Sequence, residues 1–309
     1  MGKIAFIFPG QGAQKVGMGK DVYDQYDESK KIFDKADEVL GYSLTDIIFN
    51  GPEETLKQTY HTQPALLVTS LAIMEAFKES NIQPDFVAGH SLGEYTALVA
   101  AGALSLEDAV RTVRKRGELM DQAVPSGVGA MAAVLGADKD KLLTLTQDIT
   151  QEGHVVELAN VNCPGQIVVS GSAAGVAAVE ARAKEESGAK RVIPLEVSGP
   201  FHSSLMKSAA SGLGQYLDEV EIKDASIPVI SNVTAKALSE GNDMKKLLVE
   251  QVVSPVQWED SVNTLLNQGV DTFYEIGSGK VLMGLVKKID RSVKIHAIHD
   301  VAAIQSSKE

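Results

Sequence analysis

The sequence predicts an α/β fold: a mostly parallel sheet, interrupted by a small inserted unit of ferredoxin-like type. Two apolar runs, residues 3–8 and 86–88, each end at a glycine-containing turn, as buried parallel strands do. Helical patterns lie between and after these runs, and strands that alternate with helices indicate a parallel sheet with right-handed crossovers. The third observation is a change of pattern within residues 127–197.

The segment 127–197 has the order of elements of a ferredoxin-like unit. An apolar run at 128–135 is followed by a polar helical stretch and by two adjacent strands around the Asn-Cys-Pro-Gly of residues 162–165. A second helix and a strand at 191–197 complete the segment. The resulting order, βαββαβ, is typical of a small ferredoxin-like domain.

Strand and helix alternation resumes after this insertion, with apolar strands at 227–233 and 272–276. The chain has 309 residues, which is above the usual size of one compact unit. We therefore expect a large α/β subdomain made of residues 1–126 and 198–309, with residues 127–197 as the small subdomain.

Composition narrows the class of protein. The formal net charge is -12 and the basic residues are scattered, which argues against a nucleic-acid partner. Cys163 is the only cysteine, so no intrachain disulfide can form and a reducing compartment fits. No stretch approaches the ~20 apolar residues that a membrane span needs. We expect a cytoplasmic protein that does not insert into membranes.

Residues 89–93 (Gly-His-Ser-Leu-Gly) have the spacing of a nucleophile turn. The motif directly follows the strand at 86–88 and opens a helical run that ends before Gly102. Glycines at both ends of the motif allow a tight turn that leaves the Ser91 hydroxyl exposed. At the start of the helix the Leu92 amide points toward the turn, where it can hold a developing oxyanion. Ser91 is the predicted nucleophile.

A serine nucleophile needs a base, and His202 is the best candidate among six histidines. It lies in a loop of small residues and proline after a predicted strand. His90 is adjacent to Ser91 but points elsewhere if the strand alternates, so we expect it to shape the pocket. No acidic residue stands out between Ser91 and His202 as a third member. We therefore expect a dyad whose imidazole is oriented by main-chain carbonyls or an amide.

Arg116 stands on the inner edge of a predicted helix. The helix follows a capping box at residues 105–108, and at ~100° per residue Arg116 projects beside the apolar face. Arg111, Arg114 and Lys115 project toward solvent. An inward arginine needs an anion: either a buried Asp or Glu, or a carboxylate of the substrate bound through two parallel hydrogen bonds.

The glycine-rich residues 10–14 do not form a nucleotide site. A dinucleotide fingerprint would need glycine at Lys15, and a phosphate loop would need lysine at Met18. What remains is a loop at the carboxyl end of the sheet, suited to aim the Gln11 amide at an oxyanion. Cys163 is a weak rival nucleophile because it lies in a predicted hairpin, without a helix amino terminus to lower its pKa.

Five blocks in one order make the chain similar to the malonyl-CoA:acyl carrier protein transacylases of type II fatty acid synthesis: residues 10–14, 89–95, 116–117, 200–203 and 254–258. The resemblance runs nearly end to end. It implies an α/β-hydrolase-like large subdomain with a ferredoxin-like insertion.

The resemblance also implies roles for individual residues. The nucleophile falls on Ser91 and the base on His202, while the remaining roles fall on Arg116 (carboxylate binding), Gln11 and Leu92 (oxyanion amides) and Gln251 (support beside the histidine). The family commonly has serine where this chain has Phe201, and Gly-Pro-Gly where it has residues 277–279. Neither difference touches an assigned role.

The activity implied is transfer of a malonyl group from coenzyme A to the phosphopantetheine thiol of acyl carrier protein through a malonyl-serine ester. Malonyl-CoA is then a substrate, and we expect no permanently bound cofactor, no metal and a monomer. Two alternatives stay open: a serine thioesterase or esterase with water as acceptor, and a non-catalytic module that docks carrier proteins. Candidate docking residues for an acidic carrier are Lys184, Lys190, Arg191, Lys207, Lys280, Lys287 and Lys288.

Overall fold

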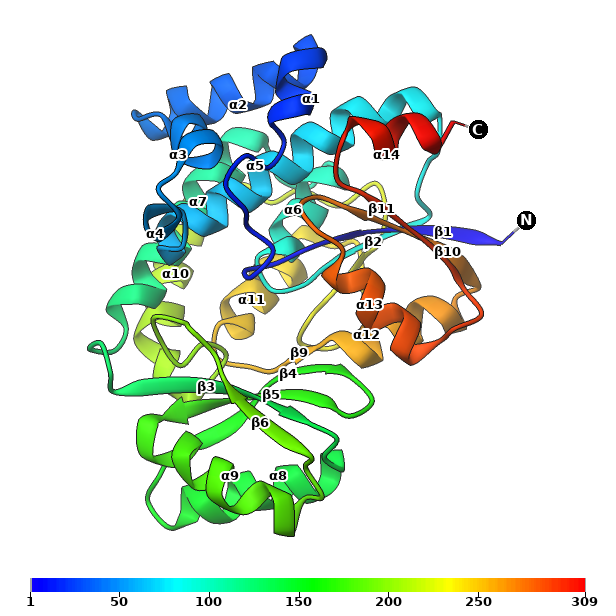
Figure 1. Ribbon diagram of the computed structural model, residues 1–309. Helices are drawn as coiled ribbons and strands as arrows, with labels where there is room; N and C mark the ends of the chain where they lie inside the picture. The colour runs from blue at the N-terminus through cyan, green and yellow to red at the C-terminus, as the bar shows by residue number, and fades with distance from the viewer. Residues whose placement is uncertain (1, 309) are drawn as a thin grey trace.

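The computed structural model describes residues 2–308, which form two sheets with helices around them (Figure 1). The large sheet has six strands in the order β11-β10-β1-β2-β7-β8. Every neighbouring pair is parallel except β7 and β8. This confirms the predicted α/β fold with a mostly parallel sheet. The strands are β1 (Lys3–Phe8), β2 (Phe86–Gly89), β7 (Val229–Ile230), β8 (Ala237–Leu238), β10 (Val270–Ile276) and β11 (Lys294–Ile298).

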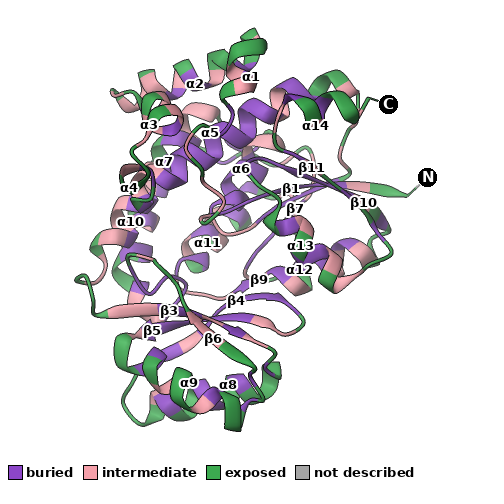
Figure 2. Cartoon of the chain, viewed as in Figure 1, coloured by how far each residue is buried: buried purple, intermediate pink, exposed green. Residues whose placement is uncertain are grey.

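Strand β1 is covered on both faces, because successive side chains of a strand point to opposite sides. Phe6 and Phe8 pack in one hydrophobic cluster with α5 (Thr59–Phe77), α6 (Gly93–Ala100) and α7 (Leu106–Gln122). Ala5 and Ile7 pack in a second cluster with α12 (Trp258–Asn267) and α13 (Val281–Ile289). Figure 2 shows the strands buried between these two helical layers.

The other helices pack around this core. None of the helices within residues 2–308 is long and apolar enough to cross a membrane. Their bounds are α1 (Lys20–Gln25), α2 (Asp27–Leu40), α3 (Leu44–Asn50), α4 (Glu53–Leu56), α10 (Lys207–Asp218), α11 (Gly241–Gln251) and α14 (Val301–Ser306).

The small sheet has the order β6-β3-β5-β4-β9. Its first four strands are antiparallel and follow the ferredoxin-like order, with α8 (Lys139–Gln151) and α9 (Ala173–Glu186) packed on one face. This agrees with the predicted βαββαβ unit. The strands are β3 (Gly129–Leu135), β4 (Val156–Cys163), β5 (Gln166–Ser172), β6 (Arg191–Pro194) and β9 (Val256–Gln257).

Two details of this sheet differ from the prediction. The last strand ends at Pro194 rather than Val197, because the chain turns away there toward the large sheet. The fifth strand, β9, comes from outside the insertion and pairs parallel with β4. The subdomain limits at residues 127 and 197 stay a prediction.

Candidate active site

Ser91 lies on a sharp turn between β2 and α6. Its φ is 50°, in the left-handed region that non-glycine residues seldom adopt. The turn needs glycine at both ends because the backbones meet closely. A Cβ on Gly89 would lie 1.9 Å from the carbonyl carbon of Gly93, and a Cβ on Gly93 would lie 2.2 Å from the Phe8 oxygen. This is the strand, turn and helix arrangement expected of a nucleophile elbow.

Asn232, just beyond β7, clamps this turn. Its Oδ1 accepts a hydrogen bond from the Ser91 amide at 2.8 Å, and its Nδ2 donates to the Gly89 carbonyl at 2.7 Å. Asn232 is fully buried. The two bonds hold the backbone on either side of His90, so that Ser91 keeps its strained conformation.

His202 Nε2 lies 2.8 Å from Ser91 Oγ. Its Nδ1 lies 2.8 Å from the main-chain carbonyl of Gln251, at the end of α11. Because a carbonyl only accepts, Nδ1 carries the proton and Nε2 is free to take one from the serine. Burial, helped by the charge of Arg116, lowers the pKa of His202 to about 3. The imidazole is therefore neutral at neutral pH, as a general base must be.

Arg116 is 1% exposed, and its guanidinium reaches Ser91. One terminal nitrogen donates to Gln63 Oε1 at 2.8 Å; the other donates to Gln251 Oε1 at 2.9 Å and to Ser91 Oγ at 3.0 Å. All three acceptors are neutral. None of the ion pairs within residues 2–308 includes Arg116, so the alternative of a direct buried ion pair does not hold.

The prediction that Arg114 projects toward solvent is wrong. Its guanidinium carbon lies 5.3 Å from the ring centre of Tyr42 and 4.5 Å from that of Tyr60. It donates to the Tyr42 hydroxyl at 2.9 Å and to Glu118 at 2.7 Å. Helical periodicity assigned this residue to the outer face of α7, but Tyr42, in the turn after α2, and Tyr60, at the start of α5, pack against it.

Gln11 and Leu92, the predicted oxyanion donors, both line a small cavity of ≈ 110 Å³. Ser91, Arg116 and His202 line the same cavity. Neither the Gln11 nor the Leu92 backbone N–H donates to another acceptor within the described chain, residues 2–308. Both amides are thus available to an oxygen in that cavity.

His90 points away from the serine. Its Nε2 lies 2.8 Å from Asn162 Oδ1, and its ring lies 5.6 Å from that of Trp258. Burial lowers the pKa of His90. It forms a wall shared by the cavity at Ser91 and a second cavity of ≈ 250 Å³. The two cavities also share Gln11, Asn160 and Leu195, so they are adjacent across this wall.

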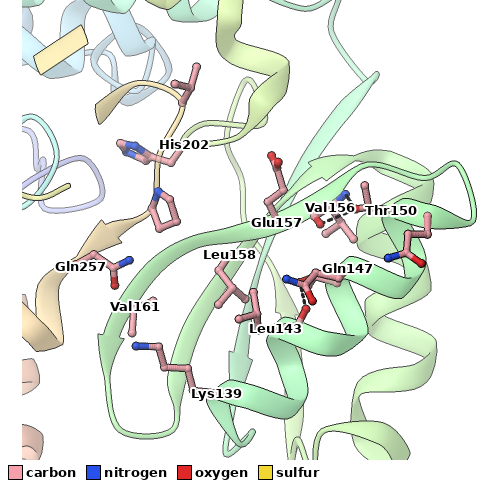
Figure 3. Close-up of a pocket in the computed structure, with 14 residues that line it drawn as sticks. Lys139, Leu143, Gln147, Thr150, Val156, Glu157, Leu158, Val161, His202 and Gln257 are labelled. Atoms are coloured by element: carbon pink, nitrogen blue, oxygen red, sulfur yellow. Dashed lines mark hydrogen bonds between the residues drawn. The ribbon is translucent and has the colours of Figure 1, made fainter. Parts of the chain in front are cut away.

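A larger cavity of ≈ 740 Å³ lies between α8, β4 and the segment before α12 (Figure 3). His202 is at its edge, while Leu143 and Leu158 line its apolar side. Neither Ser91 nor Arg116 lines it. Ser91, His202 and Arg116 all line the small cavity, which is therefore the candidate active site. Within residues 2–308 no three His, Cys, Asp or Glu side chains are grouped so that they could hold a metal ion.

The geometry of a serine, an imidazole and two free amides is that of acyl transfer chemistry, and comparison with known proteins agrees. The family model for the acyl transferase domain matches residues 5–304, nearly the whole chain. The chain belongs to the acyl transferase family.

Curated relatives of this acyl transferase match over its full length. The malonyl CoA-acyl carrier protein transacylase of Bacillus subtilis (strain 168) is 59% identical over 313 residues, covering 100% of this chain and 98% of the relative. The protein of the same name from Staphylococcus aureus (strain MRSA252) is 49% identical over 309 residues, covering 100% and 99%.

Solved structures agree with the fold. An acyl carrier protein S-malonyltransferase from Vibrio cholerae has a TM-score of 0.95 and 44% identity, covering 98% of this chain and 99% of that one. A malonyl-transacylase in complex with a type II PKS acyl-carrier protein has a TM-score of 0.95 and 40% identity, covering 99% and 98%. The α/β-hydrolase-like architecture with its small inserted sheet is therefore confirmed.

The acyl transferase site also contains buried polar residues that the sequence did not predict: Gln63, Glu94 and Asn232. Glu94 is 5% exposed, and burial raises its pKa to about 7. Its position three residues after Ser91, in the first turn of an otherwise apolar helix, was a signal that could have been used. Gln63 and Asn232 carried no such signal, because buried amides resemble exposed ones in a sequence.

Proposed function

We propose that this acyl transferase moves a malonyl group from coenzyme A to the phosphopantetheine thiol of acyl carrier protein, through a malonyl ester on Ser91, and so supplies fatty acid biosynthesis. The observation that carries the proposal is the Arg116 guanidinium, buried 3.0 Å from the Ser91 hydroxyl with only neutral partners. A buried cation with no counter-ion bonded to it, beside a nucleophile, favours an acyl group that brings its own carboxylate.

In the first half of the reaction, His202 Nε2 takes the Ser91 proton while Oγ attacks the thioester carbon. The N–H groups of Gln11 and Leu92 donate to the oxyanion that forms. The tetrahedral adduct collapses, the C–S bond breaks, and the leaving sulfur takes the proton from His202. The helix end that supplies the Gln251 carbonyl carries partial negative charge and stabilises the transient imidazolium.

The second half runs the same steps in reverse. His202 takes the proton of the carrier's thiol, the sulfur attacks the serine ester, and Ser91 leaves with the proton. The ≈ 250 Å³ cavity is the proposed channel for the thiol arm of both donors. Amides of Asn160, Asn162 and Gln166 line it and suit the amide groups of a pantetheine chain.

The mouth of this channel is the proposed docking place for the carrier protein. Lys288 Nζ donates to Gln166 Oε1 at 2.9 Å, and Lys280 precedes α13, whose Val281 is 54% exposed. Of the seven basic candidates, Lys280 and Lys288 are therefore favoured. Arg191, which pairs with Leu135 in the small sheet, is a third. We further propose that the protein acts as a monomer, because the whole site comes from one chain.

Intact-protein mass spectrometry tests the covalent step. Mixing with malonyl-CoA alone should add one malonyl group to the protein, and Ser91→Ala should add none. The ester should persist until carrier protein is supplied, whereas a thioesterase would hydrolyse it. Failure of the wild-type protein to form any adduct would overturn the mechanism.

Replacing Arg116 tests the choice of acyl group. We expect Arg116→Ala to lower malonyl transfer by about 10- to 100-fold, the order of one charge-assisted contact, and to spare or improve acetyl transfer. Arg111→Ala, an exposed change on the same helix, is the control and should leave both rates unchanged. Equal loss with both donors would mean that Arg116 is structural.

A further inference from the structure

Building on the proposed function, we propose that Glu94 is a positioning residue for substrate selection: through the side-chain amide of Gln251 it holds the Arg116 guanidinium where an acyl carboxylate can bind.

The Glu94 side chain is close to Ser91, His202 and Arg116 but forms no hydrogen bond with any of them. It lies in the first turn of α6 and is 5% exposed. Its Oε2 accepts from Gln251 Nε2 at 2.7 Å and from the Asn232 backbone N–H at 3.2 Å. Both donors are neutral, so this buried carboxylate has no direct cationic partner of its own in the described chain. The side chain of Gln251 links this carboxylate to the positive charge of Arg116.

Gln251 has only one favourable amide orientation. Its Nε2 is surrounded by three acceptors: Glu94 Oε2 at 2.7 Å, the Ser91 carbonyl at 3.1 Å and Asn232 Oδ1 at 3.1 Å. A flipped amide would set its oxygen against all three and its N–H groups against the guanidinium. Glu94 is the only charged acceptor of the three and makes the shortest bond. Glu94 is therefore the main group that fixes the orientation in which Gln251 Oε1 faces Arg116.

This relay has a different consequence from a direct ion pair. A carboxylate bonded directly to the Arg116 guanidinium would occupy the N–H donors that a substrate carboxylate needs. One amide further away, Glu94 offsets part of the cost of burying the positive charge without itself bonding to the guanidinium. Arg116 can then exchange its bond to the Ser91 hydroxyl for a substrate carboxylate while Gln251 keeps it in place.

The base of the catalytic dyad does not depend on this relay. His202 is held by the main-chain carbonyl of Gln251, not by its side chain. Loss of the Glu94 charge should therefore affect donors with a carboxylate more than donors without one. A residue that only stabilised the fold would affect both alike.

The test compares single-turnover acylation of Ser91 by malonyl-CoA and acetyl-CoA at pH 8 in the full-length protein. We expect Glu94→Gln to lower malonyl efficiency about tenfold, the order of one charge-assisted bond, through a higher half-saturating concentration. The maximal rate and the acetyl reaction should be nearly unchanged. Glu185→Gln, which removes the same charge from an exposed position of α9, is the matched control.

A swapped variant, Glu94→Gln with Gln251→Glu, separates charge placement from hydrogen bonding. It keeps a donor and an acceptor between residues 94 and 251, but it sets the carboxylate directly on Arg116 and also against the Ser91 carbonyl and Asn232 Oδ1. The second effect should slow both donors alike, so the measured quantity is the malonyl-to-acetyl ratio, which we expect to fall by about another tenfold. Because it retains these groups, it also decides the question if Glu94→Gln fails to fold.

Three results would overturn the inference: an unchanged malonyl-to-acetyl ratio in Glu94→Gln, equal loss with both donors, or a swapped variant with wild-type malonyl preference. These results are distinct from failure of the proposed function, which would appear as absence of the malonyl adduct in the wild-type protein.

Discussion

At the scale of single residues, His202 is oriented by the main-chain carbonyl of Gln251. Hydrolases of similar fold use a carboxylate for this purpose. A carboxylate beside His202 would raise the pKa of the imidazole, whereas the neutral Gln251 carbonyl adds only a hydrogen bond. Burial and the Arg116 charge therefore dominate, and the pKa of His202 falls to about 3. The base stays deprotonated across the physiological range.

The pH dependence of acylation follows from this. A base with a pKa of about 3 is neutral at every higher pH, so His202 should cause no loss of rate as pH falls from 8 to 5. Quenched-flow mass spectrometry of the malonyl adduct measures this. Glu94, with a pKa of about 7, titrates between pH 5 and 8 as well. The pH profile of acylation is therefore also measured in Glu94→Gln, which removes this titration. A fall centred near 6.5 in both proteins would contradict the assignment of a neutral, buried base.

Asn232 is expected to matter to every donor equally. Asn232→Ala removes the bonds to the Ser91 amide and the Gly89 carbonyl, and leaves those buried groups unpaired. We expect a loss of about 1–3 kcal/mol in the free energy of unfolding, and slower acylation by malonyl-CoA and acetyl-CoA in the same proportion. Urea unfolding and acylation rates measure the two effects. A loss confined to malonyl-CoA would place Asn232 in substrate selection instead.

At the scale of elements, the site depends on how closely α6 approaches the sheet. The helix begins at Gly93, directly over the end of β1, and its amino terminus is what aims the Leu92 amide at the cavity. A side chain at the contact would push the helix away from the strand. The glycines of the motif thus position the nucleophile and the oxyanion donors together.

Two glycine substitutions test this contact. Gly93→Ala would set a Cβ 2.2 Å from the Phe8 oxygen, and we expect it to destabilise the protein by about 1–3 kcal/mol or more and to abolish acylation. Gly284→Ala is the matched control: it lies within α13, a Cβ there would meet nothing within 4 Å, and we expect it to stabilise by about 0.5–1 kcal/mol. Denaturant midpoints compare them. Equal effects would mean that the close approach is not required.

At the scale of the whole molecule, the two sheets are joined through their cores. Strand β9 leaves the large subdomain to pair with β4, and Cys163 at the end of β4 packs in the same hydrophobic cluster as Val256 and Trp258. The active-site cavity draws residues from both sides of this joint. The two parts should therefore unfold together.

Labelling of Cys163, the single cysteine, measures whether the two sheets separate. Cys163 is fully buried, and burial raises its pKa, so both access and thiolate content are low. We expect a thiol reagent to react slowly with the native protein, and the urea dependence of labelling to coincide with loss of helical circular dichroism. Rapid labelling without denaturant would show that the sheets separate independently.

The sequence by itself determined the features that depend on short-range patterns. Strand and helix alternation, the turn that exposes Ser91 and the inward position of Arg116 all follow from spacing within about ten residues, because periodicity and turn chemistry are local. Where residues distant in the sequence cover an expected surface, as Tyr42 and Tyr60 do at Arg114, the same local reasoning failed.

Only the tertiary structure decided which polar groups meet around the nucleophile. The Ser91 amide finds Asn232 across 141 residues, the Ser91 carbonyl finds Gln251 across 160, and Glu94 finds Gln251 across 157. Hydrogen bonds require placement within a few tenths of an ångström, and no periodicity encodes that across separate elements. The residue types for acyl chemistry could be predicted from the sequence, whereas packing alone brought a carbonyl to His202 and a relayed carboxylate to Arg116.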